Sequence, residues 1–254
     1  MTATPRYFTG RVVREAKEAD FEVASMDNEQ VFGKVFHRLG FAEAIDRDLL
    51  TDYQVVVGVD DATYRDWAQR GRFVTLDGTE VTDARTLAGQ IGLAEAMRRY
   101  DLHRTITFHS QVKRAEEFAR SLPEVIAWMP ARQRPTGHLW SDYASGEMPA
   151  GQRHALLQHL GRLDHGEQGL LANARCLAQG VDVPTLDSVA FVDPRRSEVD
   201  IVQAVGRAIR LSTHKTVGTI VIPVFIDTDD DPAVAPPTEL SSEFIELLAK
   251  LVVV

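Results

Sequence analysis

The stretch Gly169-Leu-Leu-Ala-Asn-Ala-Arg-Cys-Leu-Ala-Gln-Gly-Val-Asp-Val-Pro184 gives the first strong indication of the fold. It predicts a buried strand from Gly169 to Asn173, followed by a polar turn. The segment Gly180-Val-Asp182 predicts a second turn, which Pro184 closes. A second apolar strand is predicted over Ser188 to Val192. Short apolar runs bounded by turn residues are typical of strands that are covered on both faces.

A second stretch, Gln203-Ala-Val-Gly-Arg-Ala-Ile-Arg210, predicts a helix with one amide and two guanidinium groups on one face. Gln203, Arg207 and Arg210 are spaced by four and three residues, so in a helix they project the same way. An apolar stripe that would hold this helix on a core consists of Val202, Val205 and Ile209. Ser197-Glu-Val-Asp200 predicts a capping box. Two planar, permanently charged groups suit a polyphosphate ligand, and a solvated basic face is the alternative interpretation.

The order of these two stretches resembles motifs V and VI of the superfamily 2 helicases and translocases, in which GVDVP precedes QxxGRxxR. Two further segments extend the resemblance. The predicted strand Thr105-Ile-Thr-Phe-His109, with a helix that Ser110 can cap and that stops at Pro123, resembles motif IV. Thr2-Ala-Thr-Pro-Arg6 resembles motif III, so the resemblance covers about residues 1–226.

The resemblance implies an ATP site between this chain and a first motor lobe. Arg207 and Arg210 would act as arginine fingers on the β- and γ-phosphates, and Gln203 and Gly206 would belong to the same nucleotide site. Asp182 would bind the ribose hydroxyl or connect motif V to motif VI, and Gly180 would allow the backbone turn. These residues would stabilise the charge of the phosphoryl-transfer transition state.

The resemblance also implies a contact with the backbone of DNA or RNA. Ser110, Asn173 and Arg175 would make this contact, largely without regard to base sequence. Thr2 and Thr4 would couple the two lobes. Cleft closure with ATP and opening after hydrolysis would move this lobe along the nucleic acid.

The motifs that hold ATP and Mg²⁺ in the first lobe do not occur in the sequence. It contains no G-x-x-x-x-G-K-[ST] phosphate loop and no Asp-Glu-x-His run. We therefore expect ATP and Mg²⁺ to be bound mainly by a missing N-terminal motor lobe, and the chain alone to be inactive. The expected organisation is the end of the first lobe and an inter-lobe segment over residues 1–50, a RecA-like domain over 51–226, and an acidic loop with a C-terminal helix over 227–254.

Composition limits the remaining classes of protein. The 37 acidic residues exceed the 28 Lys and Arg by nine, so we expect weak and strongly salt-dependent nucleic-acid binding. The single cysteine, Cys176, excludes an internal disulfide and suits a reducing compartment, and no segment resembles a signal peptide or a membrane span. We therefore expect a cytoplasmic protein without membrane partners. The eight histidines show no spacing typical of a metal site.

Strands that alternate with helices predict an α/β fold with a mainly parallel sheet. The further elements expected are strands over residues 53–59, 139–143 and 217–225, and helices over 83–100 and 150–160. Two other functions stay open. The first is the motor subunit of a type I- or type III-like restriction enzyme with a nuclease domain or subunit, which the Met26-Asp-Asn28 and Phe32-Gly33 stretch and the GVDVP form favour. The second is a stand-alone Rossmann-type module, which would need a G-x-G-x-x-G that is missing.

Overall fold

The computed structural model describes residues 8, 14, 16–21, 23–37, 39–57, 84–164, 166–174, 183–193, 198–212 and 215–223. Within these residues a six-stranded sheet has the order β1-β6-β5-β2-β4-β3, and every neighbouring pair is parallel. The strands are β1 (Asp52–Val57), β2 (Arg104–His109), β3 (His138–Ser145), β4 (Glu167–Ala174), β5 (Ser188–Phe191) and β6 (Val217–Ile222). The predicted α/β fold with a parallel sheet is confirmed.

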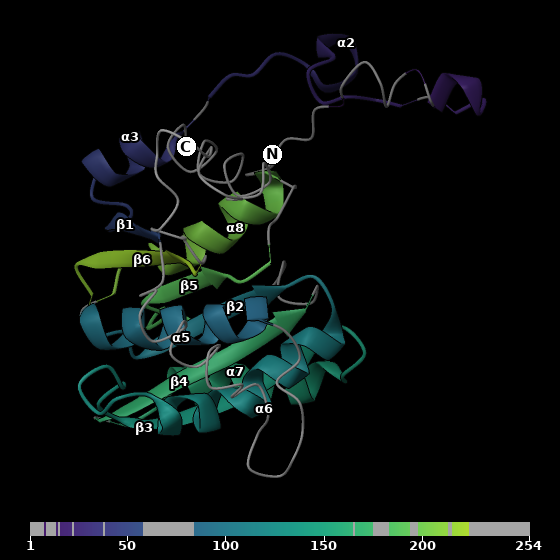
Figure 1. The fold of residues 1–254 in the computed structure, drawn as a ribbon. Helices are drawn as coiled ribbons and strands as arrows, with labels where there is room; N and C mark the ends of the chain where they lie inside the picture. The colour runs from purple at the N-terminus through teal and green to yellow at the C-terminus, as the bar shows by residue number, and fades with distance from the viewer. Residues whose placement is uncertain are drawn as a thin grey trace, which may run out of the picture.

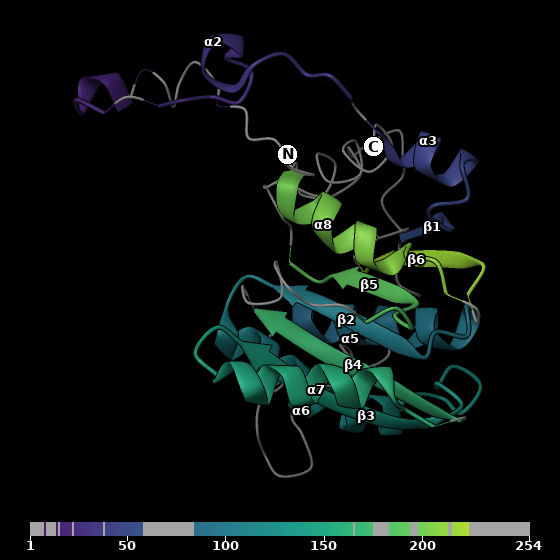
Figure 2. The same ribbon diagram turned by 180° about the vertical axis from the view of Figure 1, so that it is seen from behind.

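Helices cover both faces of the sheet. The longer ones are α5 (Ala84–Arg99), α6 (Val112–Trp128), α7 (Ala150–Gly161) and α8 (Glu198–Ala208). Helices α5 and α6 lie on the face toward the viewer in Figure 1, and α7 and α8 lie on the face toward the viewer in Figure 2. Two short helices, α2 (Glu29–Phe32) and α3 (Phe41–Asp46), precede β1. Helix α3 lies beside β1 and α8, whereas α2 stands away from the sheet (Figures 1 and 2).

Strand β4 shows why the sheet needs a layer on each face. Leu170 belongs to the core under α5 and α6, whereas its neighbour Leu171 belongs to the core under α7 and α8. Side chains alternate between the two faces of a strand, so a strand covered on both sides is apolar at consecutive positions. This explains the apolar run that the sequence places there.

Two proline positions correct the predicted element ends. Pro123 does not stop its helix, because α6 continues to Trp128 with Pro123 inside it. The strand predicted to run through Pro223 ends at Ile222, and Pro223 follows it directly. Proline lacks an amide hydrogen to donate to a ladder, which explains why β6 stops there.

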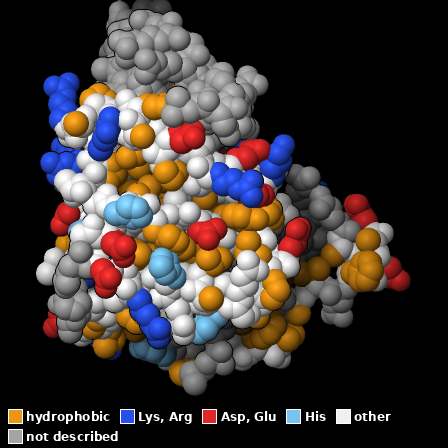
Figure 3. Space-filling view, turned by 90° about the horizontal axis from the view of Figure 1, so that it is seen from below, with side chains coloured by type: hydrophobic (Ala, Val, Ile, Leu, Met, Phe, Trp, Pro, Cys, Tyr) orange, Lys and Arg blue, Asp and Glu red, His pale blue; other side chains and the backbone are white. Residues whose placement is uncertain are grey.

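The surface has a mixed charge on the face that Figure 3 shows. Basic side chains are scattered among acidic ones there, with apolar side chains between them. On that face, outside the atoms drawn in grey, the basic groups do not form the continuous field that sequence-independent binding of phosphates needs.

Candidate functional site

The two motif VI arginines lie at the end of α8, but only one of them is in the helix. Arg207 is in the last turn, whereas α8 ends at Ala208 and Arg210 forms an isolated bridge with Leu50. The Arg210 amide donates to the Arg207 carbonyl at 3.4 Å, as in a tightened last turn. The expectation of one helix through Arg210 is therefore wrong, although the guanidiniums remain close enough to interact.

Positive charge is concentrated at this end of α8. Burial lowers the pKa of Arg207, and the neighbouring Arg210 lowers it further. Burial also lowers the pKa of Lys215 to about 8, while Asp187 raises it and Arg210 lowers it. Several half-buried cations beside one another favour an anionic ligand, because an anion relieves both their repulsion and their loss of hydration.

Gln203 and Gly206 lie on α8 before the arginines, and both are partly buried. Phe41 of α3 packs beside Gly206, where a Cβ would lie 3.8 Å from the phenyl ring. This spacing is an ordinary van der Waals contact. Helix α3 therefore rests on α8 one residue before Arg207.

The backbone of this turn is held by residues from distant parts of the chain. The Thr51 amide and hydroxyl both donate to the Ile209 carbonyl, at 2.8 and 3.0 Å. The Lys215 ammonium donates to the Ala208 carbonyl at 2.6 Å and to the Leu186 carbonyl at 2.7 Å. Sequence reasoning missed Thr51 and Lys215, since each acts on a backbone carbonyl and belongs to no motif.

A second group of polar residues lies beyond the carboxyl ends of the strands, at the end of the sheet opposite to the arginines. The Asp193 carboxylate, two residues after β5, accepts from the Ser110 amide and the Ser110 hydroxyl, both at 2.8 Å, and from the Arg114 guanidinium at 2.8 Å. Ser110 therefore donates to Asp193 and does not cap α6, whose N-cap position is taken by Gln111. The predicted cap at Ser110 is wrong because Asp193 competes for the hydroxyl.

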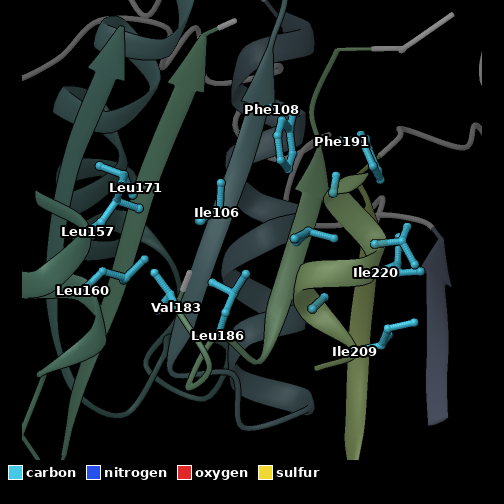
Figure 4. Close-up of a cluster of buried hydrophobic side chains, with 14 of the residues drawn as sticks. Ile106, Phe108, Leu157, Leu160, Leu171, Val183, Leu186, Phe191, Ile209 and Ile220 are labelled. Carbon is cyan, nitrogen blue, oxygen red and sulfur yellow. The ribbon is translucent and has the colours of Figure 1, made fainter. Parts of the chain in front are cut away.

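The two groups are separated by the length of the strands. In Figure 4 Phe108 lies near the tip of β2, whereas Ile209 lies beside the beginning of β6. The arginine-bearing end of α8 lies at the amino-terminal ends of the strands, because its last carbonyls accept from Thr51, just before β1, and from Lys215, just before β6. Ser110 and Asp193 follow β2 and β5 and lie at the carboxyl edge. The structure does not bring the arginines and Ser110 into one site.

Of the other predicted site residues, the structure describes only Asn173. Asn173 is only 1% exposed in β4, paired with Phe108 and Ala144, and its role toward nucleic acid stays a prediction. The remaining ones lie outside the described residues: Thr2, Thr4, Arg175, Gly180 and Asp182. In the part of the chain that the structure describes, no group of three or more His, Cys, Asp or Glu could hold a metal ion. No helix in the described ranges has both the length and the apolar character to cross a lipid bilayer.

Comparison with known proteins supports a helicase C-terminal domain. Residues 91–212 match the family described as "Helicase conserved C-terminal domain". A probable helicase of African swine fever virus is 24% identical over 238 residues, which make up 91% of this chain and 23% of the viral protein. The chain thus spans about a quarter of the length of the curated relatives it matches.

Solved structures of restriction enzymes share the fold. The DNA-bound type ISP restriction-modification enzyme LlaBIII superposes with a TM-score of 0.77 and 31% identity, covering 98% of this chain and 17% of that enzyme. A fragment assigned to the HsdR subunit of a type I restriction enzyme from Vibrio vulnificus has a TM-score of 0.56 and 22% identity, covering 85% of this chain and 42% of the fragment. The parallel sheet and these matches support a superfamily 2 helicase C-terminal domain over residues 91–212.

Proposed function

We propose that this chain is the second motor lobe of an ATP-dependent superfamily 2 translocase and that Arg207 and Arg210 are its arginine fingers. The observation that carries the proposal is the pair of neighbouring, half-buried guanidiniums at the end of α8. A planar guanidinium can donate two parallel hydrogen bonds to phosphate oxygens, and its charge persists at every physiological pH. A first motor lobe would present ATP to these two side chains.

The chemistry of the arginines is charge stabilisation. Negative charge spreads over the transferred phosphoryl oxygens and the leaving oxygen in the transition state. Donors that are already fixed in place stabilise this charge without reorganisation. Gln203, one turn before Arg207, would orient the attacking water or the γ-phosphate. Mg²⁺ would be held mainly by the first lobe, whose Asp-Glu-x-His run this sequence does not contain.

We favour DNA translocation within a restriction system over the other members of the superfamily. The support is LlaBIII, whose DNA-bound structure matches nearly the whole chain at 31% identity. A nuclease domain or subunit would then act on DNA that the motor has moved. In a protein that joins a first lobe to this chain, duplex DNA should stimulate ATP turnover far more than duplex RNA of the same sequence does.

Arginine substitutions in such a two-lobe protein test the proposal. Arg207→Ala or Arg210→Ala should lower kcat for ATP by about a thousand-fold, as for other arginine fingers, with a much smaller change in KM. Arg207→Lys should also fail, since a point charge does not reproduce the planar fork. Arg98→Ala, which removes an exposed arginine from the end of α5, is the matched control and should leave kcat unchanged. Normal turnover in the Arg207 and Arg210 variants, with the fold intact, would refute the assignment.

The 254-residue chain by itself should hydrolyse no ATP above background, because it lacks the phosphate loop and the magnesium carboxylates of the first lobe. A phosphate-release measurement with and without duplex DNA tests this. ATP turnover that copurifies with the chain through successive columns and is lost in Arg207→Ala would refute the proposal that hydrolysis needs both lobes.

A further inference from the structure

The segment from Arg207 to Arg210 is held through the carbonyl groups of the two residues between the arginines. Lys215 donates to the first carbonyl, that of Ala208, at 2.6 Å. Thr51 donates to the second carbonyl, that of Ile209, through both its amide and its hydroxyl. These carbonyls lie at the end of a helix, where intrahelical donors are missing. The two side chains therefore supply the capping that the helix itself lacks.

Lys215 connects three parts of the fold. Its ammonium also donates to the Leu186 carbonyl, which precedes β5, so the end of α8 is tied to the beginning of that strand. Lys215 itself stands two residues before β6. The ammonium also complements the partial negative charge of the helix C-terminus. The position of the arginine segment is thereby fixed relative to β5 and β6.

Gly218 allows the helix end to approach the sheet closely. A Cβ at this position would lie 2.5 Å from the Ala208 carbonyl oxygen, which is shorter than any tolerated contact. The same carbonyl is the one that Lys215 binds. Glycine is thus required where the helix end rests on β6, and the close approach puts the carbonyl within reach of the ammonium.

The lysine holds this position against an electrostatic cost. Burial and the nearby Arg210 disfavour its charge and Asp187 favours it, with the net result that its pKa is lowered to about 8. Arg207 and Arg210 also repel each other. A segment that carries adjacent like charges needs a rigid backbone if both guanidiniums are to point at one ligand. A misplacement of about 1 Å in such a site can cost a hundred-fold in rate.

We propose that Lys215 and Thr51 are positioning residues for the arginine fingers, which they hold through the Ala208 and Ile209 carbonyls. The inference rests on the proposed function of Arg207 and Arg210. Neither residue is expected to touch ATP. Each acts through the backbone, so loss of either should lower the rate of the chemical step and leave ATP affinity nearly unchanged.

The test uses the two-lobe protein with Mg²⁺-ATP and duplex DNA. Thr51→Val removes the hydroxyl and keeps the amide donor, whereas Thr51→Ser keeps both. Lys215→Met removes the ammonium and keeps most of the side-chain volume. We expect Thr51→Val and Lys215→Met to lower kcat about ten-fold or more with little change in KM, and Thr51→Ser to retain it.

Thr219→Val is the matched control. Thr219 is a buried threonine of β6 whose side chain lies on the opposite face of the strand from Gly218, and its hydroxyl accepts from Gln54 at 3.1 Å. Thr219→Val should lower the free energy of unfolding by about as much as Thr51→Val does and should leave kcat unchanged. In an Arg207→Ala background, Lys215→Met and Thr51→Val should add little further loss, because the group that they position is gone.

The outcomes separate the two proposals. If Arg207→Ala itself leaves turnover intact, the proposed function fails. If Arg207→Ala abolishes turnover but Thr51→Val and Lys215→Met lower kcat no more than Thr219→Val does, the positioning role is wrong. If Lys215→Met does not fold, Thr51→Val compared with Thr51→Ser decides, since the backbone amide donor is preserved in both.

Discussion

Asp187 is a partly buried carboxylate that joins the beginnings of two strands. It precedes β5 and accepts from the amides of His103 and Arg104 at distances from 2.8 to 3.1 Å. Burial raises its pKa to about 6, although the two amides, Ser188 and His103 act in the opposite direction. A carboxyl group in this position is expected to make the stability of the domain depend on pH.

Replacing Asp187 by Asn should remove that dependence. The pKa of Asp187 in the native state lies above the ordinary value of an aspartate, so the native state binds the proton more tightly than the unfolded state does. The resulting stabilisation is complete below about pH 4 and is lost as the pH rises through about 6. The free energy of unfolding of the natural protein, relative to Asp187→Asn, should fall by about 2 to 3 kcal/mol between pH 4 and pH 7. Urea unfolding at several pH values measures this difference, and a constant difference would contradict the assignment.

Asp193 should be more important for stability than its partner Arg114. The Asp193 side chain is 5% exposed and that of Arg114 is 31% exposed. Asp193→Ala should cost about 3 kcal/mol, because it removes a buried acceptor that a partly buried guanidinium and the Ser110 amide both use. The same substitution should cost less in an Arg114→Ala background. A double-mutant cycle in urea measures the coupling, and additive effects would show that the pair contributes nothing.

At the scale of elements, α6 shows how a proline is tolerated inside a helix. Pro123 cannot donate to the Ala119 carbonyl four residues earlier. The Ser141 hydroxyl of β3 donates to that carbonyl at 2.8 Å instead. The helix therefore continues to Trp128 because the neighbouring strand supplies the missing donor.

A cycle of substitutions at Ser141 and Pro123 tests this explanation. Ser141→Ala should cost about 1 to 2 kcal/mol, since it leaves a buried carbonyl unsatisfied. Pro123→Ala restores an amide that can bond to Ala119, so Ser141→Ala should cost less in that background. Thermal or urea unfolding of the four proteins gives the coupling. Equal costs in both backgrounds would show that the serine hydroxyl does not replace the proline amide.

At the scale of the whole molecule, the exposed apolar side chains are concentrated before the sheet begins. Phe21 is 72% exposed and Phe36 is 84% exposed, and α2 contributes no buried residue. Phe41 of α3, in contrast, packs against the core beneath α8. Exposed apolar groups of this kind are typical of surfaces that contact another protein or domain. This fits the expected inter-lobe segment over residues 1–50, which stays a prediction.

The two kinds of phenylalanine should respond differently to substitution. Phe21→Ser combined with Phe36→Ser should change the free energy of unfolding by no more than about 0.5 kcal/mol and reduce self-association of the chain. Phe41→Ala should cost about 2 kcal/mol or more, because it removes packing between α3 and α8. Urea unfolding and sedimentation velocity at several concentrations measure the two effects. A large loss of stability from the double serine variant would show that the exposed residues belong to the core.

Much of the fold could be predicted because its signals are local. The apolar strands alternate with amphipathic helices, and helix α7 and the strands β2, β4 and β5 have nearly the predicted ends. The predicted ends were wrong where a group distant in sequence intervened, as Ser141 does for Pro123 and Asp193 does for Ser110. Propensity describes what a segment prefers alone, and a tertiary hydrogen bond of about 1 kcal/mol is enough to change the outcome.

The sequence by itself determined the α/β class and the family, because the motif residues and their spacing are properties of the chain. It also placed Gln203, Arg207 and Arg210 within one short segment. Only the tertiary structure decided that α8 stops between the two arginines and that Thr51 and Lys215 hold the turn. Thr51 lies 158 residues from the carbonyl that it binds. Hydrogen bonds to backbone carbonyls leave no signature in residue type, so a single sequence cannot show which distant donor they receive.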